Sequence, residues 1–392
     1  MIKYPYSKPE VTKSDINEVK KVLLGGYLSQ GEKIHKFEYE LSRYFDSKNA
    51  IVCNSGTAAL HLIYMALGIG PKAGLLTTPI TFLATANAAK MCNASVYFAD
   101  VDHISGLLTA DTIEKSLKKY KNKIKVITLV HLGGKICDLE SISKVAKKYN
   151  CLIVEDASHA AGAEYYDKGG VSSKVGSNKY SIATAFSFNA IKHVAMGEGG
   201  CVSTNNKIIA DKIKNLRSHG MLRQKNKLLY KPKEHAPWYY EMQELGWNYR
   251  ADETSCALGL SQLKRLQRGI FKRRKIARYY FNELKDIDCI ILPANIKSIN
   301  QSVWHLYPLL IDFKKIGISR SHMMKQLLKY GIQTQVHYIP LFMQPYYRNR
   351  NFFLFKESIK YYDSTLSIPL YVQLNKKDII YISSKIKSVI NH

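Results

Sequence analysis

Residues 182–204 read IATAFSFNAIKHVAMGEGGCVST. Small, aromatic and β-branched residues at both ends of this stretch predict two strands, IATAFSF (182–188) and GCVST (200–204), joined by a glycine-rich connection. Similar short runs precede them and alternate with amphipathic segments such as TAALHLIYMAL (57–67) and LESISKVAKKYN (139–150). This alternation between about residues 48 and 205 predicts a mostly parallel α/β sheet with helices on both faces. The other strands expected in the sheet are AIVCN (50–54), AGLLTT (73–78), SVYFAD (95–100), IKVITLV (124–130) and CLIVED (151–156).

A smaller C-terminal α+β domain is expected after the sheet. A long helical pattern at 252–285 links the two parts, so we expect a large domain at 1–251, with an N-terminal arm, and a small domain at 252–392. Two polar stretches are expected to be loops, 168–180 at the surface and 223–240 as a mobile or substrate-proximal loop. The small domain is expected to contain strands at HLYPLLID (305–312) and GIQTQVHYI (331–339), a helix after Ser319 and a terminal helix near 376–390.

Composition narrows the possible partners. The chain has 58 basic and 31 acidic residues, and its net charge of +27 would attract polyanions. The charge is distributed, and no nucleic-acid-binding signature accompanies it, so we expect no nucleic-acid partner. The seven cysteines are scattered without CxxC spacing, which predicts neither a disulfide framework nor a metal site. The sequence contains no apolar run of about 20 residues and no signal-peptide core, so we expect a cytoplasmic protein without a membrane partner.

Two predicted strand ends carry candidate ligand-binding residues. In CNSGTAALHL (53–62) a helix begins near Thr57, and its N-terminal N–H groups could bind an anion, although Ser-Gly-Thr is equally a good helix cap. In VEDASHA (154–160) Asp156 ends an apolar strand, where open α/β sheets bind their ligands. Its carboxylate could keep a pyridinium nitrogen protonated or could cap a helix. His159 is either a core histidine or a contact to the same ligand.

Lys192 lies between apolar residues in the connection after strand 182–188. Loss of hydration lowers the pKa of an ammonium group, which suits Schiff-base chemistry. In so basic a chain, however, a single lysine is usually an ordinary surface cation. The order of the motifs therefore supports a functional role for Lys192 over that of a surface cation. A phosphate-type turn comes first, followed by an aromatic residue in TTPITFLATANA (77–88) and then by Asp156, Ser187 and Lys192.

With this order, and with FSFNAIK…GEGG, EDASHA and LGWNYRADE (245–253), the sequence resembles the DegT-like sugar-nucleotide aminotransferases of fold type I. The resemblance covers about residues 4–390. It implies an enzyme that depends on pyridoxal 5'-phosphate (PLP), with Lys192 as Schiff-base lysine and Asp156 on the pyridine nitrogen. Asn248 matches a position that reaches the phosphate from the neighbouring subunit, which implies a homodimer with shared active sites. The other implied cofactor contacts are Gly56, Thr57 and Ser187 at the phosphate, Phe82 on the ring face and His159 near the 3-hydroxyl.

Further stretches, YLSQG (27–31), HLYP (305–308) and TQVHYIP (334–340), resemble the branch of pseudaminic acid-type biosynthesis of surface or flagellin glycans. This resemblance implies transfer of an amino group from L-glutamate to C4 of a UDP-linked 4-keto-6-deoxy-N-acetylhexosamine. Departures at 189–200 and 168–180 leave open another nucleotide keto-sugar, of GDP-perosamine type or with a 3-keto group. An alternative of another class is a non-catalytic, polyanion-binding regulator on the same fold, against which the presence of Lys192 argues. The implied substrate contacts are Tyr6, Gly26, Tyr27, Leu28, Ser29, Gln335, Val336, His337 and Tyr338.

Overall fold

The computed structural model describes residues 2–230, 237–296, 298–348 and 354–391. Its largest sheet has seven strands, and they are the seven expected from the sequence. β9 runs antiparallel to both of its neighbours, and the four remaining pairs are parallel, so the mostly parallel sheet is confirmed. In spatial order the strands are β1 (Asn49–Cys53), β9 (Gly200–Thr204), β8 (Ala183–Ser187), β5 (Leu152–Asp156), β4 (Ile124–Val130), β2 (Gly74–Thr77) and β3 (Val96–Phe98).

Both faces of this sheet are buried. Consecutive strand residues belong to different apolar clusters, with Leu75 and Val126 on one face and Leu76 and Ile127 on the other. Because side chains alternate along a strand, nearly continuous apolar runs of this kind require a layer of helices on each face. The first face packs against α3 (Gly56–Ala66), α4 (Ala84–Met91) and α7 (Lys207–Leu216). The second packs against α2 (Glu32–Phe45), α5 (Ala110–Tyr120), α6 (Leu139–Lys148) and α8 (Glu253–Leu263).

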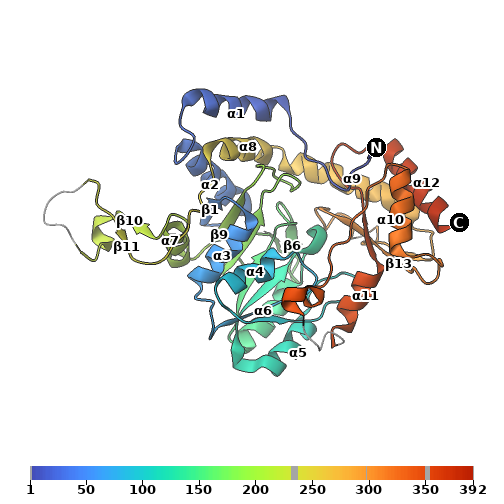
Figure 1. Ribbon diagram of the computed structural model, residues 1–392, viewed down its shortest axis with the longest axis horizontal. Coiled ribbons are helices and arrows are strands. Elements are labelled where there is room, and N and C mark those ends of the chain that lie inside the picture. The colour runs from blue at the N-terminus through green and yellow to red at the C-terminus, as the bar shows by residue number, and fades with distance from the viewer. Residues whose placement is uncertain (1, 231–236, 297, 349–353, 392) are drawn as a thin grey trace.

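The expected single helix at 252–285 is wrong, because the structure divides it into α8 and α9 (Leu266–Leu284). Arg265 leaves helical geometry between them, with φ −113° and ψ 9°. Its guanidinium donates hydrogen bonds to the Asp15 carboxylate and to the carbonyl of Glu10, which holds the break against the N-terminal segment. Apolar residues continue at helical spacing through the break, so the sequence pattern did not predict the break. The N-terminal helix α1 (Lys13–Gly25) lies along α8 (Figure 1).

The C-terminal part contains a three-stranded antiparallel sheet with its own apolar cluster. β13 confirms the strand expected at 305–312, Ser319 caps α10, and α12 matches the expected terminal helix. These elements lie at one end of the molecule, beyond α9 (Figure 1). They are β12 (Ile290–Ile291), β13 (Tyr307–Ile311), β14 (Thr365–Ile368), α10 (Arg320–Lys329), α11 (Lys356–Ser364) and α12 (Lys376–Ile390).

The strand expected at 331–339 is wrong. Only two isolated bridges form there, from Ile332 to Tyr4 and from Gln335 to Ser367. The backbone of this segment therefore bonds first to the N-terminal arm and then to β14, which interrupts a continuous ladder. Because its backbone bonds to two different partners that are distant in sequence, this segment is extended but does not pair as a strand, although its side chains alternate like those of a strand.

Two hairpins lie in or beside the stretches expected to be loops. β6 (Glu164–Tyr166) pairs with β7 (Ser172–Lys174), so part of 168–180 is a strand rather than a loop. β10 (Met221–Leu222) pairs with β11 (Glu241–Met242), and this hairpin projects away from the body of the molecule (Figure 1). Within the stretch 223–240 a short 3₁₀ turn spans Lys225–Lys227, and residues 231–236 lie outside the described residues. Among the described helices, none has the length and apolar character needed to cross a membrane.

Candidate active site

A cavity of about 580 Å³ opens at the carboxyl ends of β4, β5 and β8. Val130, Asp156 and Ser187 are the last residues of these strands, and all three line it. The start of α3 and the loop before α4 complete this side, and the segment 335–339 forms another wall. Ligands of open α/β sheets bind at this edge, because the loops that follow the strands diverge there.

The first residues of α3 form one end of the cavity. Ser55 is the N-cap, and its Oγ accepts a hydrogen bond from the amide of Ala58 at 3.0 Å, so the capping interpretation is confirmed. Gly56 and Thr57 follow and line the cavity with Ser187. A Cβ placed on Gly56 would lie 2.8 Å from the Cβ of Ser187, so the helix start packs directly against the end of β8. Free amides of a helix N-terminus beside two hydroxyl groups are suited to hold an anion.

Asp156 is held in place by three hydrogen bonds. Only 5% of the residue is exposed. Its carboxylate accepts from Thr85 Oγ1 at 2.7 Å, from Ser158 Oγ at 2.6 Å and from the Ser158 amide at 3.1 Å. No helix begins in residues 157–163, which form turns, so Asp156 is not a helix cap. Its side chain is fixed at the cavity wall instead.

Lys192 lies in the connection between β8 and β9 and lines the cavity. The residue is partly buried. Burial lowers the pKa of its ammonium group from 10.5 to about 8, although the negative charge of Asp156 opposes this shift. Lys192 is therefore not an ordinary surface cation. Near neutral pH it exchanges a proton far more readily than an exposed lysine does.

His159 is neutral and its tautomer is determined by its neighbours. The amide of Gly133 donates to its Nδ1 at 3.3 Å, so the ring carries its proton on Nε2. That Nε2–H points to the hydroxyl oxygen of Tyr338, 3.3 Å away. Burial, and then the charge of Lys192, keep the pKa of His159 well below its usual value. Tyr338 can therefore accept from His159 while its own hydroxyl proton remains available for another acceptor.

Tyr6 and residues 335–338 contribute the wall that faces the sheet edge. His337 is only 6% exposed, its Nδ1 lies 2.9 Å from Ser367 Oγ, and the Tyr6 ring lies 5.7 Å from its ring. Burial, helped by the charge of Lys192, lowers the pKa of His337 to about 3, so this ring is also neutral. Across the cavity Phe82 is 57% exposed, and its ring centroid is 6.1 Å from that of Tyr338.

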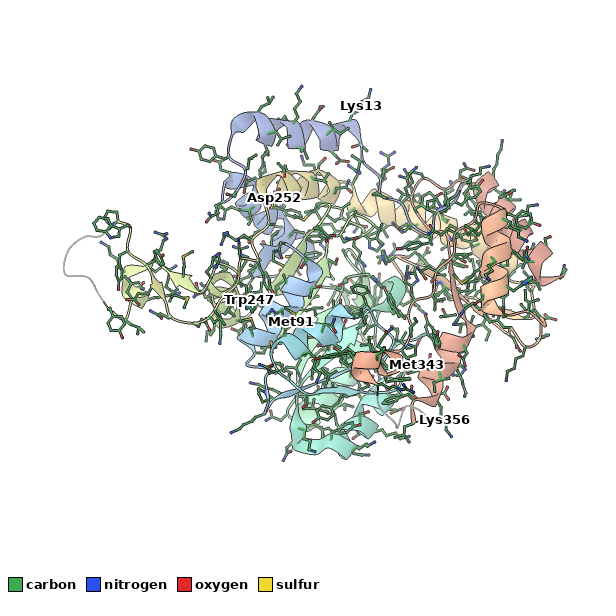
Figure 2. The ribbon with its side chains drawn as sticks, viewed as in Figure 1. Lys13, Met91, Trp247, Asp252, Met343 and Lys356 are labelled. Carbon is green, nitrogen blue, oxygen red and sulfur yellow. The ribbon has the colours of Figure 1, made fainter. Side chains whose placement is uncertain are left out.

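Gly26–Ser29 and Asn248 do not line the cavity of their own chain. Both are exposed; Gly26–Ser29 lies beside the start of α8, and Asn248 lies beside Asn54 at the end of β1. The carbonyl of Leu28 accepts from the Glu253 amide at 3.0 Å, and the carbonyl of Asn248 accepts from Asn54 Nδ2 at 3.4 Å. Figure 2 shows Trp247 near the base of the projecting hairpin and Asp252 at the start of α8.

Several polar cavity residues were not expected from the sequence as ligand contacts. His305 falls in the motif HLYP and is only 2% exposed, and its ring lies 4.3 Å from that of His159. Membership of this motif was the one available signal for it. The others include Asn189, Glu198 and Gln344. In the described part of the chain, no group of three or more His, Cys, Asp or Glu residues is placed to hold a metal ion.

A family model described as the DegT/DnrJ/EryC1/StrS aminotransferase family matches residues 9–387. The chain belongs to this family. It is 37% identical to a UDP-4-amino-4,6-dideoxy-N-acetyl-beta-L-altrosamine transaminase of Campylobacter jejuni, over 98% of this chain and 97% of the relative. The solved structure of Helicobacter pylori PseC, an aminotransferase involved in the biosynthesis of pseudoaminic acid, is similar with a TM-score of 0.86 and 31% identity, over 99% of each chain. Spr1654 from Streptococcus pneumoniae in its PLP-form has a TM-score of 0.86 at 25% identity, over 99% of this chain and 98% of its own. The expected fold class and the resemblance to aminotransferases are both confirmed.

Proposed function

We propose that this aminotransferase uses PLP to move the amino group of L-glutamate to C4 of a UDP-linked 4-keto-6-deoxy-N-acetylhexosamine, with 2-oxoglutarate as the second product. The observation that carries the proposal is that Lys192, Asp156 and the start of α3 meet in one cavity. The Campylobacter jejuni relative supports the choice of nucleotide sugar.

The cavity residues fit PLP. The amides at the start of α3, with Thr57 and Ser187, would hold the phosphate, and the close contact of Gly56 with Ser187 leaves backbone rather than a side chain at this point. Asp156 would pair with the pyridine nitrogen, and the uncovered ring of Phe82 would contact the ring face. When bound, PLP would supply an electron sink for the carbon that loses or gains the amino group.

The residues of the chain itself then account for proton transfer. Because the pKa of Lys192 is lowered to about 8, its amine can accept a proton from the donor carbon and return one to the acceptor carbon near neutral pH. The three hydrogen bonds to Asp156 prevent its carboxylate from turning away as the charge beside it changes. His159 and His337 are neutral, so they orient ligands through hydrogen bonds and add no charge.

Residues 335–338 and Tyr6 are proposed to contact the sugar and its diphosphate. They line the same cavity as the cofactor residues, with Tyr338 beside His159, and they offer hydroxyl, amide and imidazole groups. The Ser367 hydroxyl and the Tyr6 ring hold His337 in position. A polar wall that is fixed before binding favours substrates whose hydroxyl groups match it, because an unmatched group leaves buried polar atoms unpaired.

We further propose that the enzyme is a homodimer in which Asn248 and Gly26–Ser29 reach the cavity of the partner subunit. Both segments are exposed and lie outside the cavity of their own chain. The projecting hairpin near them carries exposed apolar side chains, including Tyr230 at 80% and Trp238 at 76%. Trp247 adds to this surface (Figure 2). Exposed apolar side chains gathered in this way indicate a surface that another protein covers.

A substrate panel tests the proposal. The enzyme is incubated with glutamate and UDP-, GDP- or dTDP-linked 4-keto-6-deoxy sugars, and aminated products are detected by mass. We expect the UDP-linked N-acetylhexosamine to give the highest kcat/KM. A GDP-linked 4-keto-6-deoxymannose as the best substrate would overturn the proposed sugar. Failure to aminate any member, together with no PLP adduct on Lys192 after borohydride reduction, would overturn the proposed chemistry.

A further inference from the structure

A second cavity, of about 30 Å³, shares Lys192 with the first. Its other walls are residues 8–10 of the N-terminal arm, His193 and Ala195 after Lys192, and the region where α8 gives way to α9. Its charged lining is strongly basic, with Lys8, Arg265 and Arg273 beside Lys192, and Glu10 as its carboxylate. The proposed cofactor contacts other than Lys192 do not line it.

Arg273 is a buried cation without a carboxylate partner. The residue is only 4% exposed, and its Nη1 donates to the carbonyls of Trp304 at 3.0 Å and Leu370 at 3.3 Å. Among the described residues, no carboxylate forms an ion pair with it within 4.0 Å, and burial lowers its pKa to about 10. Burial of an uncompensated charge is unfavourable, and a guanidinium has five N–H donors, so capacity beyond Nη1 is left for an anion.

The acidic groups nearby are already engaged. Arg265 forms its ion pair with Asp15, at 2.5 Å between Nη2 and Oδ2. The two oxygens of Glu10 lie 3.7 Å from Arg265 Nε and 3.5 Å from Lys272 Nζ. Within this network Glu10 lies closest to Arg265 and Lys272, and its charge offsets the burial of Arg273 only in part.

We propose that the 30 Å³ cavity binds one small monoanion of the halide class, such as chloride, through the Arg273 guanidinium with Lys8 at its rim. The cavity has about one twentieth of the volume of the active-site cavity, which favours a small anion over a sugar or a nucleotide. Charge-assisted N–H donors are the groups that such an anion prefers. Lys192 is the one proposed cofactor contact that also lines this cavity, and the proposed function does not require an anion there, so failure of the anion site would leave that function intact.

The anion would stabilise the wall behind the active site. Arg273 bonds to the carbonyl of Trp304, and the Nε2–H of His193 donates to the carbonyl of Val303 at 3.0 Å. His305, the residue after Trp304, lines the active-site cavity. Neutralising the charge of Arg273 would therefore strengthen a link between α9, the loop of Lys192 and this wall.

Bromide soaked into crystals of the complete protein tests the site directly. We expect an anomalous scattering peak within hydrogen-bond distance of the Arg273 guanidinium. Bromide peaks only at the molecular surface, with a light atom such as water in the cavity, would overturn the proposal. This measurement needs no variant, so it stands even where a substitution prevents folding.

Thermal melting gives a second test. At constant ionic strength, chloride replaces gluconate, a monoanion too large for the cavity. Above half-saturation we expect the melting temperature to rise by about 2 °C for each tenfold increase in chloride. Arg273→Met should abolish this response. Arg274→Met is the matched control, because Arg274 is the next residue of α9 and donates to the Ser302 carbonyl at 3.1 Å but does not line the cavity.

The control should melt with the same chloride dependence as the wild type. Lys8 is exposed, so Lys8→Ala should fold normally and shift the half-saturating chloride concentration several-fold upward. Equal melting temperatures of the wild type in chloride and gluconate would overturn the proposal, as would an unchanged chloride response in Arg273→Met.

Discussion

Lys192→Met is expected to stabilise the cofactor-free protein at neutral pH while it abolishes transamination. The folded protein lowers the pKa of Lys192 from 10.5 to about 8, because the ammonium group loses hydration in the cavity. A tenfold change in proton affinity corresponds to about 1.4 kcal/mol, so the protonated lysine costs the folded state about 3 kcal/mol. Methionine has a similar length and shape without the charge, and it avoids this cost.

The pH window follows from the two pKa values. Between about pH 8 and pH 10.5 the unfolded state binds more protons at Lys192 than the folded state, so the wild-type free energy of unfolding rises with pH. Below pH 8 both states are protonated and the full cost is present. The advantage of Lys192→Met should therefore be about 3 kcal/mol at pH 7, and it should shrink toward zero as the pH passes 10.5.

Urea unfolding followed by far-UV circular dichroism measures this difference in cofactor-free protein at pH 7 and pH 10.5. Lys135 is a matched control, because burial also lowers its pKa to about 8, yet it lies outside the active-site cavity. Lys135→Met should give the same pH-dependent gain in stability and should keep its turnover. No gain for Lys192→Met at pH 7 would refute the desolvation argument. A gain that persists unchanged at pH 10.5 would show that packing, rather than charge, is responsible.

Three other predictions concern the proposed site. Asp156→Asn should retain much of its PLP but lose orders of magnitude in kcat, because a neutral amide no longer keeps the ring nitrogen protonated; a near-normal rate would leave Asp156 a structural role only. Mixed dimers of Lys192→Ala and Asn248→Asp, each inactive alone, should regain part of the activity, since one hybrid site is intact, and verified mixed dimers without activity would exclude a shared site. His337→Ala and Tyr338→Phe should lower kcat/KM for the nucleotide sugar and leave the absorbance change produced by glutamate alone nearly unchanged. Equal slowing of both would remove residues 337–338 from the sugar contacts.

Much of the sheet and of the site edge could be predicted from the sequence. Each strand of the large sheet is a short apolar run, because both faces of the sheet are buried. Such a run can be recognised in the local sequence. The carboxyl ends of parallel strands share one edge, so the sequence predicts Asp156 and Ser187 at the same edge, and both line the cavity. The order of motifs then predicted a role for Lys192 among many lysines, and this residue lines the cavity.

Tertiary structure decided what depends on partners distant in the chain. Residues 331–339 alternate like a strand, yet Tyr4 and Ser367 share their hydrogen bonds and no ladder forms. The apolar period continues through Arg265, where the N-terminal arm ends the helix. The charge state of Lys192 also belongs to the folded protein, because burial lowers its pKa and only folding removes the water. Local pattern determined which residues form strands and strand ends, whereas solvation and long-range hydrogen bonds determined what those residues can do.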